Sequence, residues 1–159
     1  MRQGENSRSE AASTLKCELA GDVLRSSGAL RCTSIGWSML PTVFPGDTLV
    51  VERVSPGQVG VGDVVVSGRE GKLCAHRVID TGSDAQHPQW ITQGDAVSRP
   101  DRPVLEHELL GRVTYLIRAG RLIVVPTKLD GLERIVAKAI RHSEPAARAL
   151  VYLHRLVQA

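Results

Sequence analysis

The chain has few aromatic residues and few cysteines. Aromatic side chains make up only 3% of its 159 residues, so we expect a core built from Leu, Val and Ile. The three cysteines are odd in number and show no CxxC spacing, which argues against a disulfide framework or a zinc finger. We therefore interpret Cys17, Cys32 and Cys74 as reduced thiols, and we expect no metal or other cofactor.

The sequence also lacks segments typical of secreted or membrane-spanning chains. Residues 1–30 carry charges throughout and contain no apolar stretch of the kind found in secretory signal peptides. The longest charge-free stretch, residues 33–46, is interrupted by Gly36, Pro41 and Pro45, whereas a spanning helix needs about 20 mostly apolar residues. The sequence thus predicts a cytoplasmic protein, with peripheral membrane contact left open.

An excess of charge of one sign is missing as well. Twenty Lys and Arg stand against seventeen Asp and Glu, and the basic residues never form a run of five or six. This pattern gives no support for nucleic acid as a partner. A composition of 42% hydrophobic and 23% charged residues is typical of one globular domain.

Local patterns divide the chain into three parts. Small and polar residues over 1–12 predict a disordered arm, and the leucines at helical spacing over 13–25 predict a short helix. The part from residue 13 to residue 125 is mainly β, because β-branched runs alternate with glycine-containing turns. It predicts a compact antiparallel sheet or open barrel with flanking helices and an undetermined strand order. The expected strands are 48–54, 62–68, 72–79, 89–95, 111–117 and 121–125.

Residues 126–159 show helical periodicity. One apolar stripe runs to about residue 142, and Pro145 stands at a first-turn position of a second helical segment, so we expect a helical hairpin or one kinked helix. Basic residues outnumber acidic ones in this tail. Two alternatives remain open: the apolar stripes pack on the domain or a partner, or the amphipathic helices lie on anionic lipid.

A serine in a loop and a histidine in a strand are the candidate catalytic pair. A serine hydroxyl is a weak nucleophile unless a neighbouring base accepts its proton. Ser38 lies in GWSMLP, and His76 in KLCAHRVI supplies such a base. Lys72 is a competing base on the same strand face, but about 13 Å separates it from His76, so only one of the two can lie beside Ser38.

Five short motifs follow one another in the chain. They are Ser38-Met39-x-Pro41 with Pro45-Gly46-Asp47, Gly62-Asp63-Val64-Val65, His76-Arg77-Val78, Gly94-Asp95 with Asp101, and Gly111-Arg112-Val113. In this order they resemble the superfamily of type I signal peptidases and self-cleaving SOS repressors, and the resemblance covers roughly residues 33–114. Bacterial signal peptidases and the repressors of this superfamily use a Ser-Lys dyad, whereas the ER-type signal peptidases use histidine, so His76-Arg77 resembles the ER-type branch.

The resemblance implies a signal-peptidase-like fold and a serine endopeptidase. It assigns Ser38 as the nucleophile and His76 as the general base, and Asp95 or Asp101 would orient the imidazole. The backbone N–H of Ser38 would donate to the oxyanion. The expected partner is a peptide or protein substrate, such as a leader or signal-like peptide with a small residue before the cut. Substrate-binding positions by the same resemblance are Gly36, Trp37, Met39 and Pro41.

Two departures from the family pattern keep an alternative function open. Gly36 and Trp37 stand where the family often has a hydroxyl donor for the oxyanion and a small residue. The N-terminal membrane anchor of ER-type signal peptidases is also not seen. The alternatives are therefore a non-catalytic peptide-binding module of the same fold, or a processing factor attached to the membrane periphery. The oligomeric state is not predicted.

Overall fold

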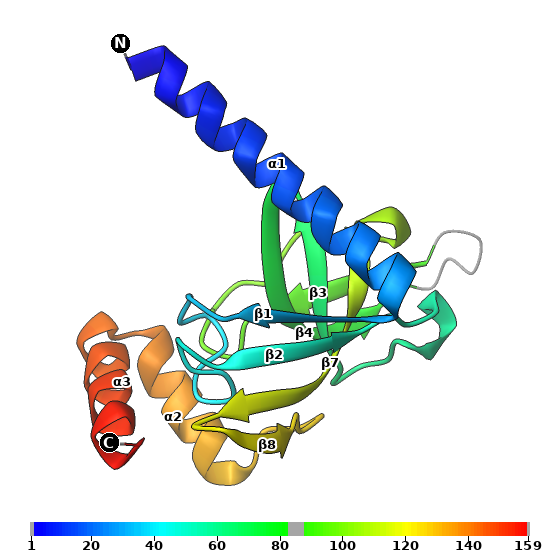
Figure 1. Cartoon of the computed structure of the whole chain (residues 1–159). Coiled ribbons are helices and arrows are strands. Elements are labelled where there is room, and N and C mark those ends of the chain that lie inside the picture. The colour runs from blue at the N-terminus through cyan, green and yellow to red at the C-terminus, as the bar shows by residue number, and fades with distance from the viewer. Residues whose placement is uncertain (1, 83–87, 159) are drawn as a thin grey trace.

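The computed structural model describes residues 2–82 and 88–158. Over these residues the protein consists of an eight-stranded antiparallel sheet with three helices (Figure 1). The helices are α1 (Arg2–Ser27), α2 (Gly131–Arg141) and α3 (Glu144–Gln158). The strands are β1 (Ala29–Thr33), β2 (Thr48–Glu52), β3 (Val64–Arg69), β4 (Lys72–Thr81), β5 (Gln89–Gln93), β6 (Val104–Leu105), β7 (Leu109–Arg118) and β8 (Arg121–Val124).

The sheet follows the order β1-β2-β7-β3-β4-β5-β6, and β8 pairs with the C-terminal end of β7. It remains open, because β1 and β6 are its two end strands in the described part of the chain. The mainly β architecture is confirmed, and all six expected strands are present within a few residues of their predicted bounds. Two strands were not expected: β1, which contains a charged residue at its centre, and β6, which has only two residues.

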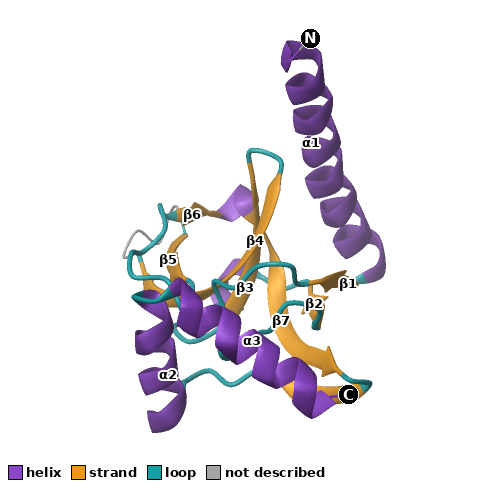
Figure 2. Cartoon of the chain, turned by 90° about the vertical axis from the view of Figure 1, so that its left-hand side faces the viewer, coloured by secondary structure: helices purple, strands orange, loops and turns teal. Residues whose placement is uncertain are grey.

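A single helix occupies the N-terminal region. The sequence predicts a disordered arm over 1–12 and a short helix over 13–25, whereas α1 runs without a break from Arg2 to Ser27. No proline interrupts this stretch, and its alanine, glutamate and leucine residues favour helix. Only its C-terminal part approaches the sheet, where Ala20 and Leu24 are buried, while the N-terminal turns project from the body (Figure 2).

The tail forms two separate helices and not one kinked helix. Asp130 caps α2 by accepting a hydrogen bond from the Glu133 N–H at 2.7 Å, and the Glu133 carboxylate accepts the Asp130 N–H at 2.9 Å. The helix ends at Arg141, and α3 begins at Glu144 with Pro145 in its first turn. No described helix combines the length and the apolar character needed to cross a membrane.

Two apolar clusters hold the region around Ser38. The first lies between the sheet and α1, and it includes Leu24, Met39, Val51, Val66 and Leu116. The second joins the loop between β1 and β2 to the C-terminal helices. It consists of Leu40, Phe44, Ile140, Ala147 and Val151. The loop that carries Ser38 is therefore packed from both sides.

Candidate active site

The loop of residues 34–47, which carries Ser38, is closed at its base by hydrogen bonds. The Ser34 N–H donates to the Asp47 carbonyl, and the Gly46 N–H donates to the Ser34 carbonyl, both at 2.8 Å. The buried Asp47 carboxylate forms an ion pair with Arg118 at 2.6 Å. Arg118 also donates to the Thr42 carbonyl at 2.9 Å. Leu40-Pro41 is a cis peptide within this loop.

The turn after β5 fixes the backbone of Ser38. The Ala96 N–H donates to the Ser38 carbonyl at 2.8 Å. Gly94 approaches so closely that a Cβ there would lie 2.6 Å from the same carbonyl oxygen. A side chain at position 94 would therefore displace the serine, which explains why the Gly-Asp motif begins with glycine.

Three side chains form a chain of hydrogen bonds across the sheet. The Ser38 Oγ lies 3.0 Å from His76 Nε2, and His76 Nδ1 lies 2.6 Å from Asp101 Oδ2. The Thr92 hydroxyl donates to that same carboxylate oxygen at 2.8 Å. Because the carboxylate accepts from Nδ1–H, Nε2 is left as the acceptor that faces the serine hydroxyl. The arrangement can take a proton from Ser38 and stabilise the resulting imidazolium.

Strand β4 determines which base reaches the serine. Lys72, Cys74 and His76 alternate with their neighbours, so they share one face of the strand. His76 is the one beside Ser38, whereas Lys72 is four residues away at the start of the strand. Burial raises the pKa of the Cys74 thiol to about 11, with a further contribution from Asp101, so this cysteine stays protonated.

The two candidate aspartates have different partners. Asp101 contacts His76, whereas the Asp95 carboxylate is buried against Arg77, with Nε–Oδ1 and Nη2–Oδ2 distances of 2.8 Å. The Thr42 hydroxyl donates to Asp95 at 2.5 Å, and the Arg77 Nη1 donates to the carbonyls of Gly62 and Pro126. Asp95 therefore ties the Ser38 loop to β4 and does not orient the imidazole.

A pocket of about 570 Å³ opens beside Ser38. Of the four predicted substrate-binding residues, Gly36 and Met39 line it, whereas Trp37 and Pro41 do not. Most of its walls are apolar, and Lys16 and Lys72 are its two basic lining residues. The hydrophobic lining residues are Cys32, Ile35, Met39, Val43, Leu49, Val66, Leu73, Cys74 and Ala75.

Two backbone segments border this pocket. On one side of β4, residues 72–77 pair with β3, but on the other side the pairing with β5 begins only at Arg77. Within the described chain, residues 72–76 thus present an edge without a strand partner. Thr33 at the end of β1 and residues 34–36 after it line the same pocket. An extended peptide can hydrogen-bond to such an edge.

No family model, curated protein or solved structure matches this chain. The function is therefore inferred from the residues and their geometry.

Two further aspects of the site are the donors available to an oxyanion and the residues that support the catalytic side chains. The Ser38 N–H has no acceptor among residues 2–82 and 88–158, so it can donate to a ligand. Gly36 supplies no hydroxyl. Sequence reasoning missed Thr92, although its place on the inward face of a predicted strand was a signal, because a buried hydroxyl needs a partner. It also missed Arg141, which donates to the Asp95 carbonyl from a distant helix and has no local signature.

Proposed function

We propose that this protein is a serine endopeptidase that cleaves leader or signal-like peptides. The observation that carries the proposal is the Ser38–His76–Asp101 chain of contacts, at 3.0 and 2.6 Å, beside an apolar pocket. A serine, an imidazole and a carboxylate in this order are the parts of acyl-transfer catalysis. The motif order and the open antiparallel sheet also support a signal-peptidase-like fold.

The chemistry follows from the positions of the three side chains. The Ser38 Oγ attacks the scissile carbonyl carbon while its proton passes to His76 Nε2, and the Asp101 carboxylate stabilises the imidazolium. The tetrahedral oxyanion accepts a hydrogen bond from the Ser38 N–H. When the C–N bond breaks, His76 returns the proton to the leaving amine. A water molecule, deprotonated by His76, then attacks the ester carbonyl, and protonation of the departing Ser38 oxygen restores the enzyme.

The pocket and the strand edge support the choice of substrate. A peptide added to the edge of residues 72–76 would run past Ser38 with alternate side chains in the apolar pocket. Uncharged residues before the cut are therefore favoured. The resemblance to signal peptidases adds the expectation that the residue next to the cut is small.

The proposal is tested with the purified full chain and a peptide library, with cleavage sites identified by mass spectrometry. Ser38→Ala and His76→Ala are each expected to lower kcat/KM by at least about 10³-fold. Lys72→Ala is the matched control: it removes the competing base but leaves the three side chains intact. Cleavage by Ser38→Ala at the wild-type rate would overturn the proposal, and loss of cleavage in Lys72→Ala alone would identify lysine as the base.

A non-catalytic peptide-binding module is the second candidate, because Gly36 provides no side-chain donor for the oxyanion. This candidate predicts that the wild-type chain binds library peptides without cutting any of them. Ser38→Ala would then bind the same peptides with unchanged affinity. A single peptide cut by wild type and left intact by Ser38→Ala decides against it.

A further inference from the structure

The two C-terminal helices expose apolar side chains on the side that faces away from the rest of the protein. Each helix buries one stripe: Ile140 of α2 and Ala147 and Val151 of α3 pack on Leu40 and Phe44 of the Ser38 loop, and Ala137 of α2 is also buried. A second apolar stripe on each helix faces solvent. We call the following residues the outer face: Leu132 (71% exposed), Ile135 (68%), Tyr152 (65%), Leu153 (58%) and Leu156 (57%).

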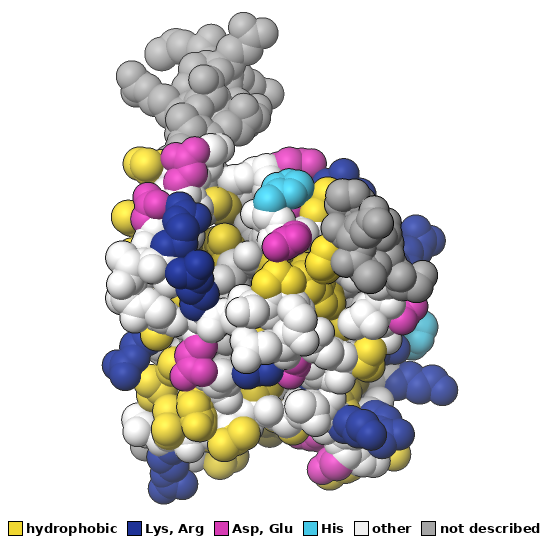
Figure 3. Space-filling view, turned by 90° about the vertical axis from the view of Figure 1, so that its right-hand side faces the viewer, with side chains coloured by type: hydrophobic (Ala, Val, Ile, Leu, Met, Phe, Trp, Pro, Cys, Tyr) yellow, Lys and Arg dark blue, Asp and Glu magenta, His cyan; other side chains and the backbone are white. Residues whose placement is uncertain are grey.

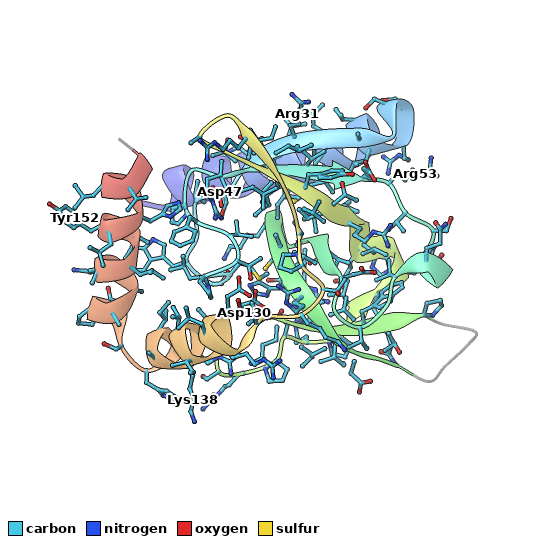
Figure 4. The ribbon with its side chains drawn as sticks, turned by 90° about the horizontal axis from the view of Figure 1, so that it is seen from below. Arg31, Asp47, Arg53, Asp130, Lys138 and Tyr152 are labelled. Carbon is cyan, nitrogen blue, oxygen red and sulfur yellow. The ribbon has the colours of Figure 1, made fainter. Side chains whose placement is uncertain are left out.

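Charge is distributed unevenly between this region and the rest of the chain. Residues 1–125 contain fourteen basic and fourteen acidic side chains, so the six basic and three acidic ones of residues 126–159 account for the whole net charge of +3. Lys138 and Tyr152 point away from the body on α2 and α3 (Figure 4). By contrast, the face in Figure 3 mixes side chains of both signs.

We propose that the outer face docks on an anionic phospholipid bilayer. Several large apolar side chains exposed together are uncommon on a surface that stays in water, and they favour insertion into an apolar phase. The cations beside them match the negative surface of acidic lipids, which attracts each nearby Lys or Arg. Nucleic acid would leave the apolar stripes unexplained, and an uncharged apolar partner would leave the concentration of cations unexplained.

A pocket next to α2 fits the headgroup of such a lipid. It has a volume of about 510 Å³, and its lining includes Lys128, Arg134 and Arg141. Arg134 uses only its Nε, on the Leu129 carbonyl at 3.0 Å, and no hydrogen bond to the described residues involves the Lys128 ammonium. Guanidinium groups with unused terminal nitrogens bind phosphate well. Arg134 and Lys138 are one turn apart on α2, so the pocket can hold a lipid phosphate at the edge of the outer face.

Docking through this face leaves the proposed substrate groove open. That groove is lined by residues from α1, from β1 and the loop after it, and from β2, β3 and β4, and none of them belongs to the outer face. The inference does not depend on catalysis by Ser38. A bound protein would hold the groove close to the bilayer surface, where leader peptides with apolar segments are concentrated.

The test is flotation of the full chain with vesicles of phosphatidylcholine alone and of phosphatidylcholine mixed with phosphatidylglycerol. We expect binding to the anionic vesicles only. Leu153→Glu combined with Leu156→Glu, and separately Lys138→Glu combined with Arg155→Glu, should each lower the partition coefficient by about tenfold or more. These side chains are exposed, so circular dichroism and peptide cleavage should stay at wild-type values.

Arg31→Glu combined with Arg53→Glu is the matched control, because it changes the net charge equally on the side away from α2 and α3 (Figure 4). This variant should float like wild type. If the control variant lost as much vesicle binding as the Lys138→Glu/Arg155→Glu variant, overall charge would explain the binding and the proposal would be overturned. Binding to neutral vesicles alone, or no binding to either kind of vesicle, would also overturn it. Inorganic phosphate that displaces the protein more strongly than chloride of equal ionic strength would assign the pocket to free phosphate. Sedimentation as a dimer that the leucine variant disrupts would assign the outer face to a second copy.

Discussion

At the scale of single residues, the site depends on which of two nearby aspartates faces the imidazole. The sequence predicts Ser38 and His76 and leaves Asp95 and Asp101 undecided, because both match acidic positions of the same motif. In the structure, the Arg77 guanidinium donates hydrogen bonds to both carboxylate oxygens of Asp95, so Asp95 is not the aspartate that faces His76. That contact depends on the path of the turn after β5, which no local pattern specifies. Asp101, six residues further on, remains available to His76.

Exchanging the two carboxylates for amides should separate their roles. Asp101→Asn is expected to lower kcat by about 10³- to 10⁴-fold with little loss of stability, because the amide favours the wrong imidazole tautomer. Asp95→Asn leaves Arg77 without its buried counter-charge, so it should destabilise the fold by about 3–5 kcal/mol. Steady-state kinetics and chemical denaturation measure both effects. Equal kinetic losses in two stably folded variants would contradict this assignment.

Glu108 supplies a pH-dependent contribution to the stability of the fold. Its carboxylate accepts from Arg69 Nε at 2.5 Å, and this hydrogen bond lowers its pKa to about 2. Because the folded chain holds this proton more weakly than the unfolded chain, the stabilisation is complete above pH 4.5 and is lost as the pH falls toward 2. Glu108→Gln should therefore reduce the free energy of unfolding by about 1–3 kcal/mol near neutral pH. Denaturation of both proteins over a pH series should show the difference shrinking in acid, and a constant difference would contradict the prediction.

At the scale of elements, α2 and α3 support the loop that carries Ser38. The sequence predicts both helices from their 3.6-residue period, but the period alone does not tell which stripe is buried when a helix has apolar residues on two sides. The structure shows Phe44 of the loop stacked on His154 of α3, with ring centroids 3.6 Å apart, and Arg118 lies over the same Phe44 ring. These contacts join residues 74 and 110 positions apart, so no local signal predicts them.

This stacked histidine should make the packing of α3 sensitive to acid. Burial lowers the pKa of His154 below its ordinary value of 6.5, and the positive charge of Arg118 lowers it further. The unfolded chain thus takes up the proton before the folded chain does, so stability is highest above pH 6.5 and declines as the pH drops below it. His154→Phe keeps the stack and removes the proton, and its melting temperature should fall less than that of wild type between neutral and mildly acidic pH. An identical fall in both proteins would assign the acid sensitivity to other groups.

At the scale of the whole molecule, the site forms from segments that are distant in the sequence. The strands and helices follow from alternation, helical period and turn residues, and most of them are predictable. The strand order is not, because β7 lies between β2 and β3 although its paired residues are 42 to 69 positions further along the chain. The pocket also combines distant segments. Residues 33–36 and 72–75 both line it, and the strand order of the sheet brings these two segments together.

The same architecture predicts that the C-terminal helices are required for activity, apart from any contact with lipid. A chain that ends at Pro126 would expose Leu40 and Phe44, which are 0% and 7% exposed in the intact protein. Uncovering two such side chains costs about 3–6 kcal/mol, a large part of the stability of an ordinary domain. The loop that positions Ser38 should therefore loosen, and peptide cleavage should fall together with the melting temperature. The outer-face variant with Leu153→Glu and Leu156→Glu is the comparison, because it leaves the buried stripes unchanged and should keep both properties. Full activity of the shortened chain would show that the sheet alone holds Ser38 in place, since the buried stripe of α2 and α3 would then contribute nothing to the site.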